Sequence, residues 1–556
     1  MDLMANQISN SVAATQTRAD FLRMVESCRP AGKGLSAAHR YVAIPLCISL
    51  FDDQLTPVLA YRRLVAPDDR EAPSFLFESV EGGERQGRHS IIGAQPTMHV
   101  VARRHRVVTT SLRPGGEDVM VDCPNPLAVP GQLSAETRLM VPPGVRLPAC
   151  FLGGWVGYAA YDTVRYGEPG KLPFDVAPSD DRDLPDVHFA FYDGVVVFDH
   201  VDKLVHLIAL AKVDVRGSDD DAGRVYDDAV RRLNERLGAL RTHSEPMSSG
   251  TIADLGAAPL ASPSNMSRGE HAAMLARASE YIKAGDIFQV VLGQRFERES
   301  GADPFDVYRA LRVVNPSPYM VYMQAEGCIL VASSPEILCR VRRGGGGGGG
   351  DDALVVTNRP LAGTRRRGRT PEEDKALEQD LLADPKERAE HVMLVDLGRN
   401  DLGVVCEPGT IALPTVMAVE RYSHVMHISS TVTGVLRAGL NCWDALRATL
   451  PVGTISGAPK IRAMQIIDEL EPVRRGPYGG GFGYVGLDGQ MDIALALRTI
   501  VVPLSRRDRA KGTWVYHLQA SGGIVADSQA EAEYQETVNK AAALGRAIEV
   551  AERAFA

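Results

Sequence analysis

Residues 517–540, HLQASGGIVADSQAEAEYQETVNK, combine features of a strand, a glycine turn and an acidic helix. Polar and apolar residues alternate over 517–521, which predicts a half-buried strand. The glycine pair that follows lets the backbone approach a neighbouring group closely. Ser528 and Glu531 have the spacing of a capping box, so we expect a helix to begin there. This stretch is therefore a candidate wall of an active site.

The predicted helix carries charge on one face. Glu533, Glu536 and Lys540 stand at spacings of three and four, whereas Val538 and Ile548 lie on another face. Two interpretations of the charged face stay open. It is either part of an active site or a solvated face with a surface Glu–Lys pair worth a few tenths of a kcal/mol. A partner elsewhere in the chain must decide between them.

Composition narrows the class of protein. The chain has 556 residues, and length alone allows about three or four domains. Its net charge of −9 argues against general nucleic-acid binding, which needs a basic surface. An anionic substrate must therefore meet positive charge that is local.

The cysteines and the apolar segments predict a cytoplasmic protein without a membrane anchor. Eight cysteines are scattered without a CxxC pair, so the sequence suggests neither a zinc site nor a disulfide scaffold. Residues 1–24 lack the apolar core of a signal peptide, and the longest apolar run, 41–51, is too short to span a membrane. Reduced cytoplasmic thiols are the simplest explanation of this cysteine usage.

Four segments are expected along the chain. They are a leader over 1–38 with a helix at 18–27, an N-terminal lobe over 39–241, a Ser/Pro/Gly/Ala-rich linker over 242–265 and a catalytic domain over 266–556. Within the N-terminal lobe, patterning predicts strands in 41–51, 75–80, 99–101 and 187–210 and a helix at 221–240.

Local signals also describe the start of the catalytic domain and one loop inside it. Ser267 and Glu270 form a capping box, and the helix that follows should end at Gly285. The seven glycines at 344–350 lack a following GK[ST], which excludes a phosphate loop. We interpret them as a flexible loop between two strands.

The segment 333–338, SSPEIL, places Glu336 after a proline inside an otherwise apolar strand. An unpaired carboxylate buried there would cost several kcal/mol or be driven neutral. A neutral carboxylic acid is a proton donor.

Three other segments of the second half contain polar residues that core packing does not require. Residues 284–296 place Gln289 on a strand, and the segment RPLAGTRRRG at 359–368 places Gly363 and Thr364 at a turn beside three arginines. The segment AEHVMLVDLGRND at 389–401 places Glu390 at the start of an apolar helix.

Taken in order, these segments resemble the chorismate-utilising enzymes. The resemblance also includes HVMHISS (424–430), GTISGAPK (453–460), PYGGGFGYVG (477–486) and the strand, turn and helix of 517–540. It covers residues 267–547. In the first half, FLFESVEGGERQGRHSIIG (75–93) and GGWVGYAAYD (153–162) resemble the matching half of anthranilate synthase component I. The resemblance implies an α+β fold of two interleaved lobes, built on large antiparallel β-sheets packed with helices.

Three positions discriminate between reactions within this family. Members that add water to chorismate carry a lysine base before VVL, where this chain has Gln289. Aminodeoxychorismate synthases typically carry a nucleophilic lysine in PIKGT, where this chain reads PLAGT with Ala362. Glu78 and Ser79, with NPSPYM at 315–320, match the tryptophan pocket of feedback-inhibited members.

These positions imply the large subunit of an anthranilate synthase, which forms anthranilate and pyruvate from chorismate and ammonia. Two alternatives stay open from the sequence. One is aminodeoxychorismate synthase component I, which lacks the aromatising elimination. The other is a catalytically silent regulatory subunit that binds tryptophan or chorismate.

The resemblance also implies roles for individual residues. The catalytic set is Glu336 as the acid for the C4 hydroxyl, His427 beside the ring, Gln289 and Thr364. Substrate would be bound by Gly363, Thr364, Tyr478, Arg498, Ser521, Gly522, Gly523 and Lys540. Mg²⁺ would lie on Glu390 and Glu536, with Glu533 one turn away. Tryptophan would lie against Glu78, Ser79, Pro318, Tyr319 and Met320.

Each role has a structural alternative when the residue is taken alone. Glu390 can be a helix-start carboxylate favoured by the macrodipole, His427 a core histidine and Arg498 a salt-bridge partner in the sheet. The coincidence of these residues on one family's pattern favours the functional interpretation. No glutamine amidotransferase motif of the GxCxGxQ type is present. We therefore expect ammonia from solution or from a glutaminase subunit, in a heterotetramer of two large and two small subunits.

Overall fold

A computed structural model describes residues 14, 16–29, 39–65, 70–81, 85–113, 115–242, 247–251, 262–344, 353–422 and 425–555. Apart from Gly344, the expected polyglycine loop at 344–350 lies outside the described residues, between strands β17 (Ile337–Arg343) and β18 (Leu354–Arg359). In the described part of the chain, no helix has the length and apolar content needed to cross a membrane.

The first of two large sheets takes six strands from each half of the chain. Its order is β22 (Gly457–Ala458), β14 (Gln289–Ser300), β26 (Trp514–Ile524), β25 (Thr499–Pro503), β16 (Cys328–Ser334), β15 (Tyr319–Ala325), β2 (Ser74–Glu78), β5 (His89–Gly93), β12 (Val196–Asp199), β13 (Leu204–Asp214), β1 (Tyr41–Leu50) and β9 (Thr137–Leu139). Neighbours are antiparallel except β1 and β9. The halves meet where β2 pairs with β15, which places Glu78 opposite Met320.

The second sheet also combines the halves, with seven strands from the second half and five from the first. Its order is β19 (Leu361–Arg366), β21 (Val425–Val435), β18, β17, β24 (Met491–Leu495), β23 (Gly481–Gly486), β10 (Gly154–Ala159), β11 (Val187–Tyr192), β6 (Met98–Arg103), β7 (Arg106–Ser111) and β8 (Asp118–Asp122). Strand β20 (Ala412–Arg421) also pairs with β21, and β3 (Val80–Glu81) with β4 (Arg85–Gln86) forms a small separate ribbon. The halves meet at the β10–β23 pair. The expected α+β fold of interleaved, largely antiparallel lobes is confirmed.

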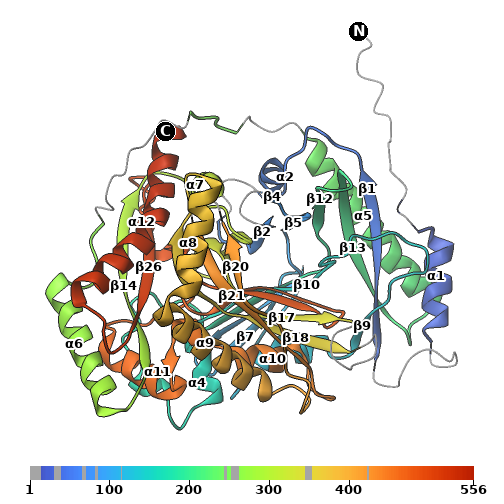
Figure 1. Cartoon of the computed structure of the whole chain (residues 1–556). Coiled ribbons are helices and arrows are strands. Elements are labelled where there is room, and N and C mark those ends of the chain that lie inside the picture. Colours follow the sequence, from blue (N-terminus) through green and yellow to red (C-terminus); the bar gives the residue numbers. More distant parts are fainter. Residues whose placement is uncertain are drawn as a thin grey trace.

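Helices cover the outer faces of the two sheets (Figure 1). They are α1 (Arg18–Ser27), α2 (Pro57–Leu64), α3 (Val129–Ser134), α4 (Val164–Gly167), α5 (Asp219–Arg241), α6 (Arg268–Ala284), α7 (Pro304–Val314), α8 (Pro371–Ala383), α9 (Pro385–Gly403), α10 (Cys442–Thr449), α11 (Lys460–Leu470) and α12 (Ala530–Ala554). Helix α12 packs on β26 and β14, α5 on β13, and α9 on β19 and β21.

The core consists of three main layers of apolar side chains. One lies between the first sheet and α1, α2, α5, α7 and α12, and another lies between the second sheet and α9, α10 and α11. A third lies between the sheets, where Phe75 of the first sheet meets Tyr192 of the second edge to face at 4.9 Å between ring centroids. The two sheets are therefore packed face to face, with helices outside.

Local capping signals predicted two helices correctly. Helix α1 follows Thr17, whose hydroxyl accepts from the Asp20 N–H. Helix α6 begins at the Ser267–Glu270 capping box and ends at Gly285, whose φ of 82° is in the left-handed region. The boundaries of the leader, the two lobes and the linker stay predictions.

The capping box expected at Ser528 and Glu531 is wrong. Helix α12 starts at Ala530 with Gln529 as its N-cap and no side-chain cap. The Ser528 hydroxyl instead donates to Glu533 Oε1 at 2.7 Å, and Glu531 pairs with Arg268. Ser528 therefore bonds to another nearby carboxylate in place of the helix cap, and only Glu531 has a distant partner.

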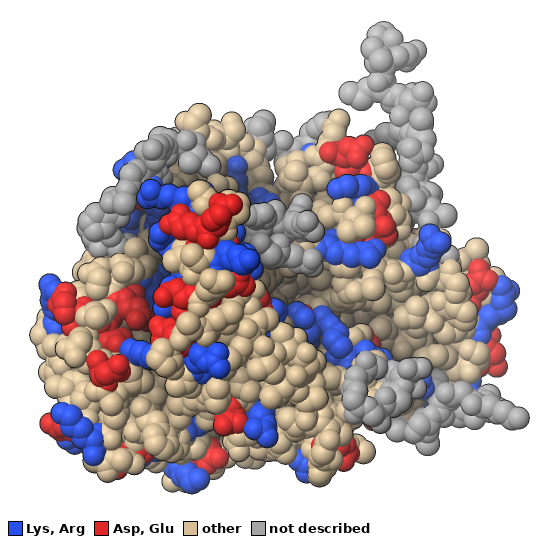
Figure 2. Space-filling model, in the orientation of Figure 1, with Lys and Arg blue, Asp and Glu red and all other residues tan. Residues whose placement is uncertain are grey.

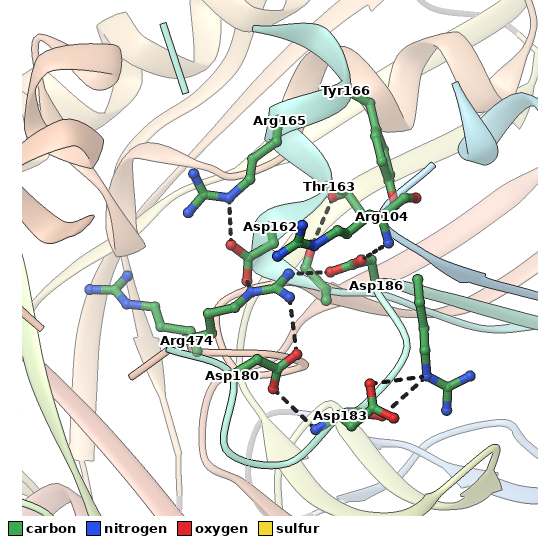
Figure 3. A network of polar contacts seen from close by, with 12 residues as sticks. Arg104, Asp162, Thr163, Arg165, Tyr166, Asp180, Asp183, Asp186 and Arg474 are labelled. Carbon is green, nitrogen blue, oxygen red and sulfur yellow. Dashed lines mark hydrogen bonds and ion pairs between the residues drawn. The ribbon is translucent and has the colours of Figure 1, made fainter. Parts of the chain in front are cut away.

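A network of buried charges joins the halves (Figure 3). Arg474, from the second half, pairs with Asp162 and Asp180 at 3.1 Å each and with Asp186. Arg165 also pairs with Asp162, at 2.7 Å. Burial raises the pKa of Asp186 to about 6 despite its pairing with Arg474. Arg474 therefore neutralises aspartates that would otherwise face one another away from water.

We predict that Arg474→Ala destabilises the protein by about 3–5 kcal/mol, since breaking a buried pair leaves an uncompensated buried charge. The midpoint of urea denaturation measures the loss. The control is Arg231→Ala, because Arg231 forms an exposed pair with Glu235, in which both side chains are more than half exposed. Its cost should be about 0–1 kcal/mol. Equal, small shifts for both variants would contradict the prediction.

Candidate active site

Two short segments carry the chain from one sheet to the other, and they lie side by side. Residues 335–336 connect β16 to β17, and residues 496–498 connect β24 to β25. The Leu495 N–H donates to the Glu336 carbonyl at 3.0 Å, and the Ser333 N–H donates to the Arg498 carbonyl at 3.2 Å. Glu336 therefore lies on a crossing between sheets, and its expected place inside a strand is wrong.

The Glu336 carboxyl is buried, with 2% of its surface exposed. Burial raises its pKa to about 8, although hydrogen bonds from the Thr454 hydroxyl and the Leu361 backbone oppose the shift. The Thr454 hydroxyl donates to Oε1 at 2.8 Å. Glu336 is therefore a proton donor at neutral pH.

His427 lies on β21 beside the segment that contains Gly363 and Thr364. Its Nδ1 is 2.9 Å from the Gly363 carbonyl and 3.1 Å from the Thr364 hydroxyl. A carbonyl only accepts, so Nδ1 carries the proton and Nε2 is left as an acceptor. Burial, with Arg498 and Lys540 nearby, lowers the His427 pKa to about 4. The imidazole is neutral, and its buried Nε2 has no hydrogen-bond partner among the described residues.

Gly363 and Thr364 lie in strand β19, not in the turn that the sequence suggested. The β19–β21 register shifts between Ala362 and Arg365, and Gly363 has a φ of +67°. This irregularity frees the Gly363 carbonyl for His427.

Arg498 occupies the second crossing with a φ of 44°, a left-handed conformation that is uncommon for a bulky residue. Burial lowers its pKa, with the Tyr422 phenol as the opposing influence. Arg498 forms no ion pair with a carboxylate within the described part of the chain. A guanidinium that is kept from water and lacks a carboxylate partner is suited to an anionic ligand.

The glycine pair of β26 lies against amide and carboxylate side chains. A Cβ at Gly523 would come within 2.4 Å of Gln289 Nε2, and one at Gly522 would lie 3.2 Å from Glu533 Oε2. Gln289 is the first residue of β14, and its amide donates to Glu390 Oε1 at 3.2 Å. The close backbone approach that was expected at these glycines is present.

Glu390 and Glu533 form a carboxylate-lined edge of the site together with the half-exposed Glu536. Burial raises the pKa of both Glu390 and Glu533, and Glu536 adds to each shift. Glu533 Oε2 is buried without a partner in the described structure. A hard divalent cation would relieve this repulsion, so the donor set fits Mg²⁺. No group of three or more His, Cys, Asp or Glu side chains among the described residues is placed to hold a metal ion.

The position of Glu390 differs from the expected one. Helix α9 begins at Pro385, after the N-cap Asp384, so Glu390 lies in its second turn. It reaches the site because α9 packs along β19 and β21. The macrodipole explanation for this carboxylate does not apply, since the effect falls off within the first turn.

Lys540 lies between the Glu536 carboxylate and the backbone of β26. Its Nζ pairs with Glu536 Oε1 at 2.7 Å and donates to the Ser521 carbonyl at 2.9 Å. The Tyr478 hydroxyl donates to Ser521 Oγ at 3.1 Å. The surface Glu–Lys pair is therefore present, and it lies at the rim of the candidate site.

The residues expected to bind tryptophan line a separate cavity of 740 Å³. Glu78, Ser79, Pro318, Tyr319 and Met320 all contribute to it, because β2 and β15 are neighbours. Both Glu78 oxygens are already bound, one by the Tyr308 hydroxyl at 2.6 Å and the other by Arg312 Nη2 at 3.1 Å.

Charge is distributed unevenly over the surface. On the face shown in Figure 2, acidic side chains gather over α8, whereas basic side chains follow the lower edge of a central hollow. The net charge of −9 therefore does not prevent local positive charge.

Sequence reasoning missed two residues that the structure places at the site. Thr454 holds the Glu336 carboxyl, and Tyr422 packs on His427 with ring centroids 5.6 Å apart. Thr454 lies in the GTISGAPK segment, so that motif was its only signal. It is 118 residues from Glu336, and no local pattern reports a contact at that separation.

Comparisons with known proteins show the family to which this chain belongs. Residues 83–546 match the family model described as chorismate binding enzyme. The chain is 53% identical to the anthranilate synthase alpha subunit 1, chloroplastic, of Oryza sativa subsp. indica, over 93% of this chain and 90% of that protein. It is 44% identical to anthranilate synthase component 1 of Pseudomonas aeruginosa, over 93% of this chain and 98% of that protein.

A solved structure has the same architecture. The crystal structure of anthranilate synthase component I from Streptococcus pneumoniae aligns with a TM-score of 0.67 and 34% identity, over 89% of this chain and 99% of that one. From the family match and these relatives, the chain belongs to the chorismate-binding enzyme family and, within it, to the anthranilate synthase large subunits.

Proposed function

We propose that this chain converts chorismate and ammonia into anthranilate and pyruvate. The observation that carries the proposal is the buried, protonated Glu336 on a crossing adjacent to that of Arg498, which has no carboxylate partner. The two crossings therefore place a proton donor, Glu336, close to a cation that can bind an anion, Arg498. Gln289 occupies the place of a water-activating lysine and cannot deprotonate water, which supports amination over hydration.

In the first step, ammonia forms a bond to C2 of chorismate while the C4 hydroxyl leaves as water. The Glu336 carboxyl donates the proton that the leaving oxygen requires. The acceptor Nε2 of His427 takes a hydrogen bond from the hydroxyl and so orients the leaving group. In the second step, a base removes the proton from C2 and the bond between C3 and the enolpyruvyl oxygen breaks. The ring becomes aromatic, and the released enolpyruvate takes up a proton to give pyruvate.

The two carboxylates of chorismate need different partners. Arg498, Tyr478 and the backbone N–H groups of 521–523 would hold the enolpyruvyl carboxylate, with charge from Lys540. Thr364 and the backbone at Gly363 would bind the ring carboxylate or hydroxyl region. These assignments rest on position in the site.

We propose Mg²⁺ on Glu390 and Glu536, with Glu533 beside them. When bound, the cation would neutralise the ring carboxylate and fix its orientation. The support from this chain is a group of neighbouring carboxylates in which burial raises the pKa of Glu390 and of Glu533, and Glu533 Oε2 is buried without a partner among the described residues.

A glutaminase subunit is the proposed source of ammonia, because the sequence contains no amidotransferase motif. By resemblance the assembly would be a heterotetramer of two large and two small subunits. All eight cysteines are free thiols, which supports a reducing compartment such as the cytoplasm.

The direct test is anthranilate fluorescence after the purified chain is mixed with chorismate, Mg²⁺ and ammonium salt. A magnesium-dependent signal supports the proposal. A 4-amino product would instead indicate aminodeoxychorismate synthesis, and absence of chorismate consumption with both ammonium and a glutaminase partner would indicate a silent subunit.

We expect Glu336→Gln to lower kcat about 100- to 10,000-fold, since it removes the general acid. In the parent, Glu336 is protonated below its pKa of about 8, so kcat/KM at fixed free ammonia should fall as pH rises above 8. The residual activity of the variant should not show this decrease above pH 8. Glu299→Gln, on the far end of β14, is the control. A parent profile flat to pH 9.5 would refute the assignment.

Glu536→Gln and Glu390→Gln should each raise the Mg²⁺ concentration for half-maximal rate about 10- to 100-fold, through loss of a carboxylate ligand. Calorimetric Mg²⁺ titration provides an activity-independent measurement. Glu531→Gln is the matched control, because Glu531 lies on the same helix but pairs with Arg268 away from the site. Equal Mg²⁺ affinity in all variants would exclude these ligands.

L-Tryptophan is the proposed inhibitor at the cavity that residues of β2 and β15 help to line. Replacing Ser79 by Phe should fill the cavity, leaving anthranilate formation intact while raising the tryptophan concentration for half-inhibition at least about tenfold. Dose–response curves of the two proteins measure this change. Identical curves would place the inhibitor elsewhere.

A further inference from the structure

The cavity and the active site share a wall. Pro335 and Ile337 both line the cavity. Glu336, between them in sequence, directs its carboxyl to Thr454, which does not line the cavity. The proposed catalytic acid is therefore the immediate neighbour in sequence of two residues that line the cavity.

Tyr422 forms the second part of this wall. It lines the cavity, has 6% of its surface exposed, and packs its ring at 5.6 Å from the His427 imidazole with an angle of 58° between the planes. Burial raises its pKa, and the charges of Arg498 and Glu336 also act on it. A single side chain thus contacts the cavity on one side and faces the catalytic groups on the other.

Tyr422 is held in place at several points. Its hydroxyl donates to Glu420 Oε2 at 2.9 Å, and Glu420 in turn pairs with Arg359. Arg367 Nη1 donates to the Tyr422 carbonyl at 2.7 Å. Glu420 and Arg359 also line the cavity, and Glu420 lies opposite His427 in the β20–β21 ladder. An occupant of the cavity therefore meets the tyrosine and its anchors together.

We infer that Tyr422 is a positioning residue that holds the His427 ring and transmits occupancy of the cavity to the active site. The inference rests on the proposed function. An occupant that displaces the Tyr422 ring removes the packing that fixes His427, and it does so without moving one lobe against the other. Because coupling between two sites is reciprocal, chorismate must weaken tryptophan binding by the factor with which tryptophan weakens chorismate binding.

The experiment measures this coupling factor on the full chain. The Kd of L-tryptophan is determined by calorimetry with and without saturating chorismate and Mg²⁺, in the absence of ammonia and glutamine so that amination cannot occur. For the parent, the ratio of the two Kd values should lie within about 5–150. Tyr422→Leu should bring this ratio close to one, whatever its effect on the Kd measured without chorismate.

Catalysis supplies a second readout. Tyr422→Leu should lower kcat more than it changes KM for chorismate, because His427 loses its support. Tyr422→Phe keeps the ring and should retain the coupling. Tyr484→Leu is the matched control, since Tyr484 lines the same cavity but bonds to Arg342, on a wall without His427. It should leave the coupling ratio at the parent value, whatever its effect on tryptophan affinity.

The outcomes separate the inference from the proposed function. A parent chain that forms no anthranilate or binds no tryptophan refutes the proposed function. A parent that does both, with an unchanged ratio in Tyr422→Leu, overturns the inference and favours movement of the lobes. Loss of tryptophan binding in Tyr422→Leu also overturns it, because Tyr422 would then be a ligand only. If Tyr422→Leu does not fold, Glu420→Gln replaces it, because this substitution weakens the hydrogen bond that holds the Tyr422 hydroxyl. An unchanged ratio of the two Kd values in Glu420→Gln would also overturn the inference.

Discussion

Hydrogen bonding between the two halves of the chain, at the β2–β15 and β10–β23 pairs, is the constraint on which the rest of the structure depends. Buried backbone groups must be paired, so neither half can complete its sheets alone. Each half therefore contributes strands to both sheets, and the chain must pass between the sheets more than once. The ion pairs of Arg474 strengthen the same junction with charge.

The passages between sheets determine where the chemistry is placed. Glu336 and Arg498 lie on two such passages that are hydrogen-bonded to each other, so a carboxylic acid and a guanidinium from distant parts of the sequence become neighbours. Both side chains are buried, and burial disfavours their charged forms. It therefore raises the pKa of Glu336 and lowers the pKa of Arg498. The same geometry places a cavity directly behind the Glu336 passage, because Pro335 and Ile337 face the other way. The proposed catalytic acid and the proposed second binding site thus share one element of structure.

Local signals predicted local features well. The N-terminal cap of α6 and the glycine that ends this helix could be predicted from the sequence, because their hydrogen-bond partners lie within a few residues. The Ser528–Glu531 capping box failed because Ser528 bonds to Glu533 and Glu531 pairs with Arg268, which is 263 residues away. The burial of Glu336 was anticipated from its apolar neighbours, but its place on a crossing was not, since strand order is not encoded locally. Gly363 was expected at a turn and lies in a strand whose register shifts, a feature that depends on β21.

By itself, the sequence determined the types and capping of several elements, the interleaved α+β class through its resemblance, and the set of polar residues to inspect. Only the tertiary structure decided what those residues can do. The pKa of Glu336, the tautomer of His427 and the lack of a carboxylate partner for Arg498 all follow from contacts between distant segments. The role of Tyr422 depends on the same kind of contact. Burial and pairing are properties of the packed chain, and a residue's own neighbours in sequence contribute only a small part of either.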